Sequence, residues 1–263
     1  MKRYLVYYIQ ANLLELKRMA IYNISFLFDL LADLVSIVLA MLFYRILYLN
    51  IGEGLRISIE DLYILVLSVK LTGDLYNLFF GSGVHSLPSL IQYGGLDSIL
   101  IKPMNVFFML FCSNLNWKCI VNLIIDLMLF VLIFMQYNIV FSVQSICMYL
   151  VMIGISTMVY TAFNILIYLG SVVFVRMDAF SSLISSFFSL STFPAAIFRV
   201  SYLKLIFIYV IPVLVIGNFP LMAMRGVYGY HLYIAASICA LIFTLGAYWG
   251  TSSMLRHYKS ASS

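Results

Sequence analysis

Six charged side chains lie inside segments of this chain that are otherwise apolar enough to cross a membrane. They are Asp29, Asp33, Lys70, Asp74, Lys118 and Asp126. A charged side chain at the centre of a membrane helix costs on the order of 2.5–3.5 kcal/mol, so each of these groups needs a partner or water. Asp29 and Asp33 are four residues apart, as are Lys70 and Asp74, and this spacing places each pair on one helical face.

These intramembrane charges allow two interpretations. In the functional one they line a polar pathway or relay protons. In the structural one Lys70 pairs with Asp74 within its helix, or with Asp29 or Asp33 of another, while Lys118 and Asp126 lie near helix ends. We favour structural pairing, because proton-coupled carriers more often show isolated acids beside helix-breaking residues. Only Asp126 approaches that pattern.

The sequence offers no catalytic constellation. It contains no G-x-S-x-G, no H-E-x-x-H and no acid pair in a polar loop, and it lacks the phosphate loop G-x-x-x-x-G-K-[ST]. Any ATP used must therefore be hydrolysed by another subunit. The cysteines lie in apolar segments without C-x-x-C spacing, which predicts neither disulfides nor a metal site.

The composition requires a membrane to position these residues. Of 263 residues, 64% are hydrophobic and 10% charged, and the mean hydropathy is +1.07. A soluble domain carries about a quarter charged residues. The sequence therefore predicts an integral membrane protein that crosses the bilayer several times.

Six segments are long and apolar enough to span a bilayer. They are 22–49, 61–83, 106–136, 144–175, 178–198 and 231–255. The apolar segment 204–220 contains Pro212 and closes with Gly217 and Pro220, so it is too short to cross and is predicted to be a re-entrant hairpin. The expected fold is an all-α integral membrane domain over 1–263, with six transmembrane helices and a re-entrant region at 199–228.

The first twenty residues predict an interfacial helix that lies on the membrane before the first span. Leu5, Ile9 and Leu13 fall on one face of residues 1–20, and Arg3 and Lys17 on another. A frayed basic tail is the alternative. The distribution of Lys and Arg favours both termini in the cytoplasm.

The fifth predicted span is rich in serine, with Ser182, Ser185, Ser186 and Ser189 among its residues. Small hydroxyl side chains let membrane helices approach closely and form hydrogen bonds across the contact. This span packs either against its own chain or across a dimer axis, and the sequence leaves both possibilities open.

The connection between the second and third spans, 84–105, is longer than a turn requires. Its motif Gly94-Gly95-Leu96-Asp97, followed by Leu100-Ile101-Lys102-Pro103-Met104-Asn105, resembles the G-x-L-D-x-x-L-x-(R/K)-P-x-N segment of ABC-2 type permeases. Phe193-Pro194, Ile211-Pro212-Val213 and Phe219-Pro220 resemble a proline-containing region of the same group. The group usually has Pro-Ala where this chain has Pro220-Leu221.

The resemblance implies a half-transporter of the bacterial plasma membrane. Two copies of the permease, or this chain and a paralogue, would associate with two ATP-binding subunits that hold ATP and Mg. This chain would carry no cofactor and would contact membrane lipid but no nucleic acid. The transporter would export a hydrophobic or amphipathic substrate such as a lipid, drug or peptide, which suits the 16% aromatic content.

The resemblance also assigns roles to residues. Residues 87–100 would form a coupling helix in a groove of the ATPase, with Pro88 opening it and Asp97 capping the next turn. Its contact and shaping residues would be Leu87, Leu90, Ile91, Gln92, Tyr93, Gly94, Gly95 and Asp97. A helix that rests on lipid is the alternative for this segment.

In similar permeases the substrate pathway runs between the two copies and is lined by the first, second and fifth spans. The candidates here are Asp29, Asp33, Lys70, Asp74, Ser182, Ser185, Ser186 and Ser189. The alternative function is a stand-alone secondary transporter or channel that uses the intramembrane acids, Asp126 above all.

Overall fold

The computed structural model describes residues 2–21, 23–55, 57–139, 142–170, 186, 188–198, 201–227 and 229–258. Within these ranges the chain is helical and contains no strand. Five helical stretches are long and apolar enough to cross a membrane: α2 (Asn23–Leu55), the continuous run from α3 (Ile59–Tyr76) to Gln92, α6 (Lys118–Tyr137), α7 (Val143–Leu169) and α11 (Tyr230–His257). The chain is therefore a multi-pass membrane protein.

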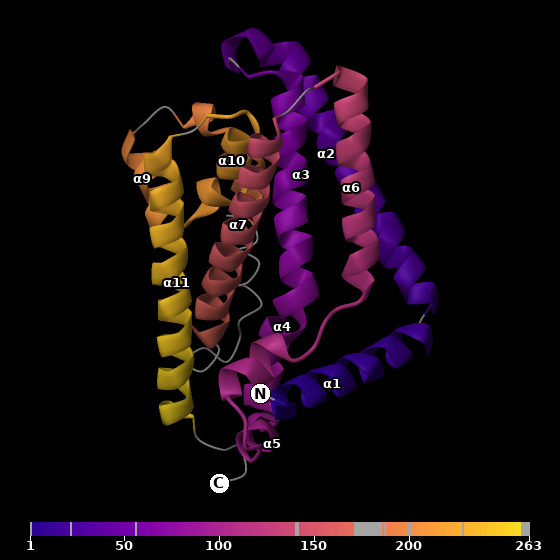
Figure 1. Ribbon diagram of the computed structural model, residues 1–263, viewed down its shortest axis with the longest axis vertical. Helices are drawn as coiled ribbons and strands as arrows, with labels where there is room; N and C mark the ends of the chain where they lie inside the picture. The colour runs from indigo at the N-terminus through magenta and orange to yellow at the C-terminus, as the bar shows by residue number, and fades with distance from the viewer. Residues whose placement is uncertain are drawn as a thin grey trace.

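The spanning helices stand side by side, with α1 (Lys2–Ile21) lying across their lower end (Figure 1). The start of α1, the end of α11 and the short helix α5 (Leu96–Leu100) lie at this end, whereas α9 (Ser201–Tyr209) and α10 (Val213–Met224) occupy the upper half. The long helix that starts at Ile59 occupies the centre. In its most apolar stretch 61% of residues are buried, against 11% in α2, so α2 is left to face lipid or a partner.

The second span is longer than the predicted 61–83. Ser58 begins it by accepting a hydrogen bond from the backbone N–H of Asp61 at 3.2 Å. The helix then continues through a π-helical turn, η1 (Asn77–Gly81), into α4 (Ser82–Gln92). Pro88 lies inside α4, so the prediction that it opens a separate short helix is wrong.

The third span begins later than the predicted 106–136. A π-helical segment, η2 (Phe108–Cys112), is followed by a break, and α6 starts only at Lys118. At the break Asn12 of α1 accepts a hydrogen bond from the Leu115 N–H at 2.7 Å and donates one to the Ser113 carbonyl at 3.5 Å. The Asn116 N–H donates to the Leu78 carbonyl at 2.9 Å. These long-range hydrogen bonds replace the helical ones that hydropathy alone assumes.

The predicted fifth span, 178–198, lies mostly outside the described residues. Its described end is no straight helix, because short 3-10 turns, η4 (Leu190–Thr192) and η5 (Ala195–Ile197), flank Pro194. Asn218 of α10 holds this end: its Oδ1 accepts from the Ala195 N–H at 2.7 Å and its Nδ2 donates to the Phe193 carbonyl at 3.1 Å.

The segment predicted to be re-entrant forms α9 and α10, which are bent by 95° with Pro212 at the start of α10. The residues of α10 from Val213 to Pro220 are all buried. Gly217 permits this close packing, because an added Cβ would lie 2.7 Å from the Ser191 carbonyl oxygen and 2.5 Å from a methyl group of Val69. If this pair counts as one span, the chain has up to six.

Candidate functional site

Lys70 is the centre of a charged cluster at the core of the helix bundle. Its ammonium group lies 2.6 Å from Asp33 Oδ1 of α2 and 3.0 Å from Asp74 Oδ2, one turn further along its own helix. Asp29 does not join this cluster, because it pairs with Lys118 at 3.1 Å. The two pairings predicted as alternatives for Lys70, within the helix and across helices, are therefore both present.

Asp126 is the most buried acid of this cluster. It is fully buried, its carboxyl lies beside that of Asp74, and neither of its oxygens accepts a hydrogen bond from a described donor. It is the ninth of the twenty residues of α6 and lies near the middle of that helix, so the prediction that it lies near a helix end is wrong. A buried carboxyl without a donor is unusual and marks a place to look for function.

A cavity of about 310 Å³ opens beside Lys70 and Asp74. Its walls come from α3, α7, α10 and the described end of the predicted fifth span. They consist of Val69, Lys70, Gly73, Asp74, Asn77, Tyr160, Phe188, Ser189, Ser191, Thr192 and Ile216. The structure thus brings together Lys70, Asp74 and Ser189 of the predicted pathway residues. Ser186 is not among the lining residues, and Ser182 and Ser185 lie outside the described residues.

Among the cavity residues that sequence reasoning missed are Asn77 and Tyr160. Asn77 lies in the π-helical turn that follows α3, and such turns are frequent at functional sites. A signal for Asn77 existed in its spacing, because it lies one turn beyond Asp74 on the face that carries Lys70. Tyr160 had no comparable signal, since it is one aromatic residue among many in an apolar span.

Hydrogen bonds between elements hold the walls of the cavity in place. The Tyr44 hydroxyl of α2 donates to Thr192 Oγ1 at 2.9 Å. Ser156 of α7 donates to the Val215 carbonyl of α10, also at 2.9 Å. These bonds fix the segment 188–192 and α10 against the spanning helices, so the cavity is a built feature of the fold.

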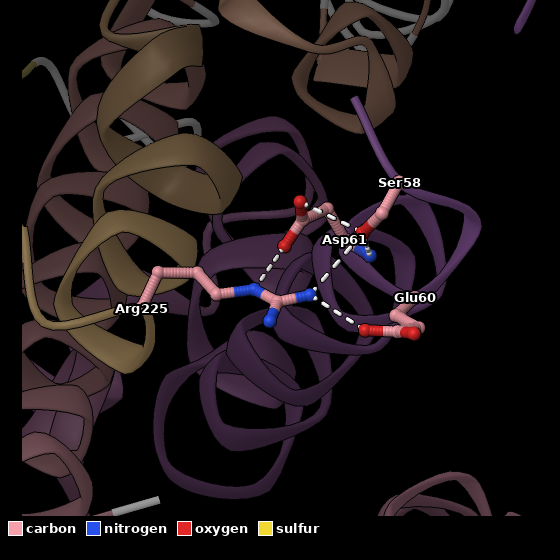
Figure 2. A network of polar contacts seen from close by, with 4 residues as sticks. All are labelled: Ser58, Glu60, Asp61 and Arg225. Atoms are coloured by element: carbon pink, nitrogen blue, oxygen red, sulfur yellow. Dashed lines mark hydrogen bonds and ion pairs between the residues drawn. The ribbon is translucent and has the colours of Figure 1, made fainter. Parts of the chain in front are cut away.

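A second charged network joins the end of α10 to the start of α3 (Figure 2). The Arg225 guanidinium, at the end of α10, hydrogen-bonds Asp61 through Nε, and its Nη2 lies 2.9 Å from Glu60 Oε2 and 3.2 Å from Ser58 Oγ. Burial lowers the pKa of Arg225, but its hydrogen bonds to Asp61 and Glu60 outweigh burial and raise the pKa overall. This network ties α10 to the first turn of α3 and was not predicted.

The predicted coupling segment forms a turn at the lower end of the molecule. Gly94 has a φ of 71°, a left-handed conformation that favours glycine, and it separates α4 from α5. The exposed side chains here are Tyr93, 78% exposed, and Ile101, 84% exposed. Gln92 is exposed as well, and Leu90 and Ile91 are half-buried.

Two details of the coupling prediction need correction. Leu87 is fully buried in a core cluster with Leu96 and Phe111, so it has no surface to offer a partner. Asp97 is not a cap: Gly95 occupies the cap position of α5, and no side chain caps that helix. The Asp97 carboxylate instead lies close to Tyr258, whose pKa is raised by burial and by that carboxylate.

Helix α1 is attached to the chain that follows the coupling segment. The Tyr4 hydroxyl accepts a hydrogen bond from the Asn105 N–H at 3.0 Å, and Lys102 Nζ lies 3.5 Å from the Tyr7 hydroxyl. With the Asn12 contacts, these bonds connect α1 to residues 102–115. The outward face of α1 carries exposed leucines, Leu5 and Leu13 among them.

The apolar helices, packed around a buried charged cluster and a cavity, have the architecture of a multi-pass membrane protein. The family model described as ABC-2 family transporter protein matches residues 34–262, so the chain belongs to this family. The family consists of membrane transport components that normally work with an ATP-binding subunit. Comparison with curated proteins and with solved structures gives no match.

Proposed function

We propose that this chain is the permease subunit of an ATP-driven exporter that moves a hydrophobic or amphipathic substrate, such as a lipid, drug or peptide. Two permeases, identical or paralogous, assemble with two ATP-binding subunits, and those subunits hold ATP and Mg. The observation that carries the proposal is the family match over 34–262, in a chain that lacks a phosphate loop of its own.

The proposed setting is the bacterial plasma membrane, with both termini in the cytoplasm. Support comes from the position of α1 and of the end of α11 at one end of the molecule (Figure 1). The exposed leucines of α1 suit an interfacial helix. At the other end, Arg225 lies near the start of α3, because it bonds Asp61. The turn at Pro194 lies there too, because Pro194, Asp61 and Arg225 line the same pocket. These contacts fit a re-entrant hairpin, which enters and leaves the membrane on this side.

The proposed contact with the ATPase is the surface formed by Gln92, Tyr93, Leu100 and Ile101, shaped by the turn at Gly94 and Gly95. These side chains are exposed, and three of them are apolar or aromatic. Such residues are typical anchors at protein interfaces. Leu90 and Ile91 support the surface from inside, because both pack against the core cluster that contains Leu87.

Co-purification with the ATP-binding subunit tests this proposal. The double variant Tyr93→Asp with Ile101→Asp is expected to lose the ATPase, since two charges replace the apolar contact surface. Val227→Asp is the matched control, because Val227 is an exposed apolar residue in the loop at the opposite end. The proposal fails if the double variant retains the ATPase as well as the control does.

A stand-alone secondary transporter is the second candidate, and one observation favours it. Asp126 is a fully buried carboxyl without a hydrogen-bond donor among the described residues, which suits a group that binds and releases a proton. This candidate predicts flux driven by an ion gradient in liposomes without any ATPase. Asp126→Asn would abolish that flux.

A further inference from the structure

We infer that the cavity beside Lys70 and Asp74 binds an organic cation, a positively charged group carried on an apolar body. The inference rests on the proposed function and specifies the cargo class of the exporter. It is carried by the charges of the cluster, by the aromatic side chains of the cavity wall and by the depth of the site.

The charged cluster of which Lys70 and Asp74 line the cavity carries more acids than bases. Among the described side chains, Asp33, Asp74 and Asp126 come together with a single ammonium group, that of Lys70. The neighbouring pair of Lys118 with Asp29 is neutral by itself. Even when Asp126 carries a proton, one negative charge remains in excess. An entering cation neutralises this excess, whereas an anion meets the carboxylates.

The cavity wall also suits a cation on an apolar body. Tyr160 and Phe188 lie on the wall and pack edge to face, with their ring centroids 4.6 Å apart. Aromatic faces attract cations, most strongly where water is scarce. Val69 and Ile216 supply the apolar surface. Among the described residues no group of three or more His, Cys, Asp or Glu side chains is placed to hold a metal ion, and this includes the three aspartates of the cluster.

The depth of the site adds a requirement for the cargo. Lys70 follows Ile59, the first residue of this spanning helix, by eleven residues, so it lies about 16 Å from that end, a distance of about half the thickness of a hydrocarbon core of about 30 Å. A molecule that reaches this depth needs an apolar part. Its charged group then finds Asp74, which lines the cavity and is itself buried.

Binding of a matched pair of probes to the purified permease tests the inference without any ATPase. Tetraphenylphosphonium and tetraphenylborate share size and shape but carry opposite charge. In phosphatidylglycerol nanodiscs, with empty nanodiscs subtracted, we expect saturable binding of the cation and none of the anion. Saturable binding of the anion, or of neither probe, overturns the inference, and this comparison needs no variant.

Two variants locate the binding. Asp74→Asn is expected to weaken cation binding at least about tenfold, whereas Glu15→Gln, which removes a carboxylate from α1, leaves it unchanged. The double variant Lys70→Met with Asp33→Asn removes one charge of each sign and is expected to keep cation binding. Unchanged affinity in a folded Asp74→Asn variant places the probe elsewhere and overturns the assignment to this cavity.

The organic cation has two possible sources, an aminophospholipid headgroup or a soluble amphiphilic amine. Phosphatidylethanolamine added to the nanodiscs competes with tetraphenylphosphonium if lipid is the source and leaves its binding unchanged if the source is soluble. Either result agrees with a cation site. Because the ATPase is absent, failed cation binding contradicts only this inference, and lost ATPase association contradicts only the proposed function.

Discussion

Arg225 hydrogen-bonds Asp61 across a sequence separation of 164 residues, and this contact joins the residue that follows one cavity helix, α10, to the first turn of another, α3. α3 contributes Lys70 and Asp74 to the cavity, and α10 contributes Ile216. The charged network at Arg225 therefore fixes the distance between two walls of the candidate site from outside the site.

Arg225→Ala is expected to destabilise the permease, since it leaves Glu60 and Asp61 close together without their cation. The loss is about 1–2 kcal/mol, because the groups are only partly buried and water screens them. Thermal unfolding in detergent measures it. The stability of Arg225→Lys should fall between those of the wild type and the alanine variant, because an ammonium group cannot reproduce the forked hydrogen bonds of a guanidinium. An alanine variant with the same melting temperature as the wild type would contradict a stabilising role for Arg225.

Gly217→Ala is expected to destabilise the permease by about 1–3 kcal/mol, because its Cβ would overlap Val69 and the Ser191 carbonyl oxygen. Gly154→Ala is the matched control. Gly154 is also helical, nothing lies within 4 Å of its added Cβ, and alanine there should be neutral or slightly stabilising. Equal melting temperatures for the two variants would contradict the close packing of α10.

Asn12→Leu is expected to release the break at 113–117, because the buried Asn12 side chain bonds Leu115 and Ser113. Faster hydrogen exchange of the Leu115 amide is the direct readout, with a stability loss of about 1–3 kcal/mol. Gln10→Leu, at an exposed position of the same helix, should leave that exchange unchanged. Unaltered exchange in the Asn12 variant would show that α1 does not shape the break.

Single cysteines test the proposed orientation. In a background without native cysteines, Ile101→Cys should react with a membrane-impermeant maleimide only after the cells are permeabilised. Val227→Cys should react in intact cells, because its loop lies at the opposite end of the helix bundle. Both positions are exposed, so reactivity reports the side of the membrane. The reversed pattern would place the termini outside.

Hydropathy predicted the five described spanning helices, because apolar length is a local property of the sequence, whereas the predicted fifth span, 178–198, lies mostly outside the described residues. It missed where the third span begins, since the break at Ser113 depends on hydrogen bonds from Asn12, about a hundred residues earlier in the chain. The four-residue spacing of Lys70 and Asp74 predicted their pairing for the same local reason. Asp33 could be offered only as one of two partners, because helix spacing does not tell which of two acids on the neighbouring helix, Asp29 or Asp33, lies level with Lys70.

The candidate site was predicted in part. Charge inside apolar segments is a strong signal, and it identified Lys70 and Asp74. Tyr160 and Asn77 became visible only once α3, α7 and the 188–192 segment were placed together. The coupling prediction failed at Leu87, because the sequence marks a residue as apolar without telling whether it faces the core or a partner.

The continuous helix from Ile59 to Gln92 has a mechanical consequence. Asp74 lies on this helix and Tyr93 directly follows its last residue. The two residues are about 28 Å apart along the helix axis. A displacement at the Tyr93 end would therefore tilt the helix and move the cavity wall that carries Asp74. Two points within that distance interrupt regular helical hydrogen bonding: the π-helical turn at 77–81, where Asn77 lines the cavity, and Pro88 in α4. The helix would transmit motion from its Tyr93 end to the cavity, and the π-helical turn would allow it to bend directly beside the cavity.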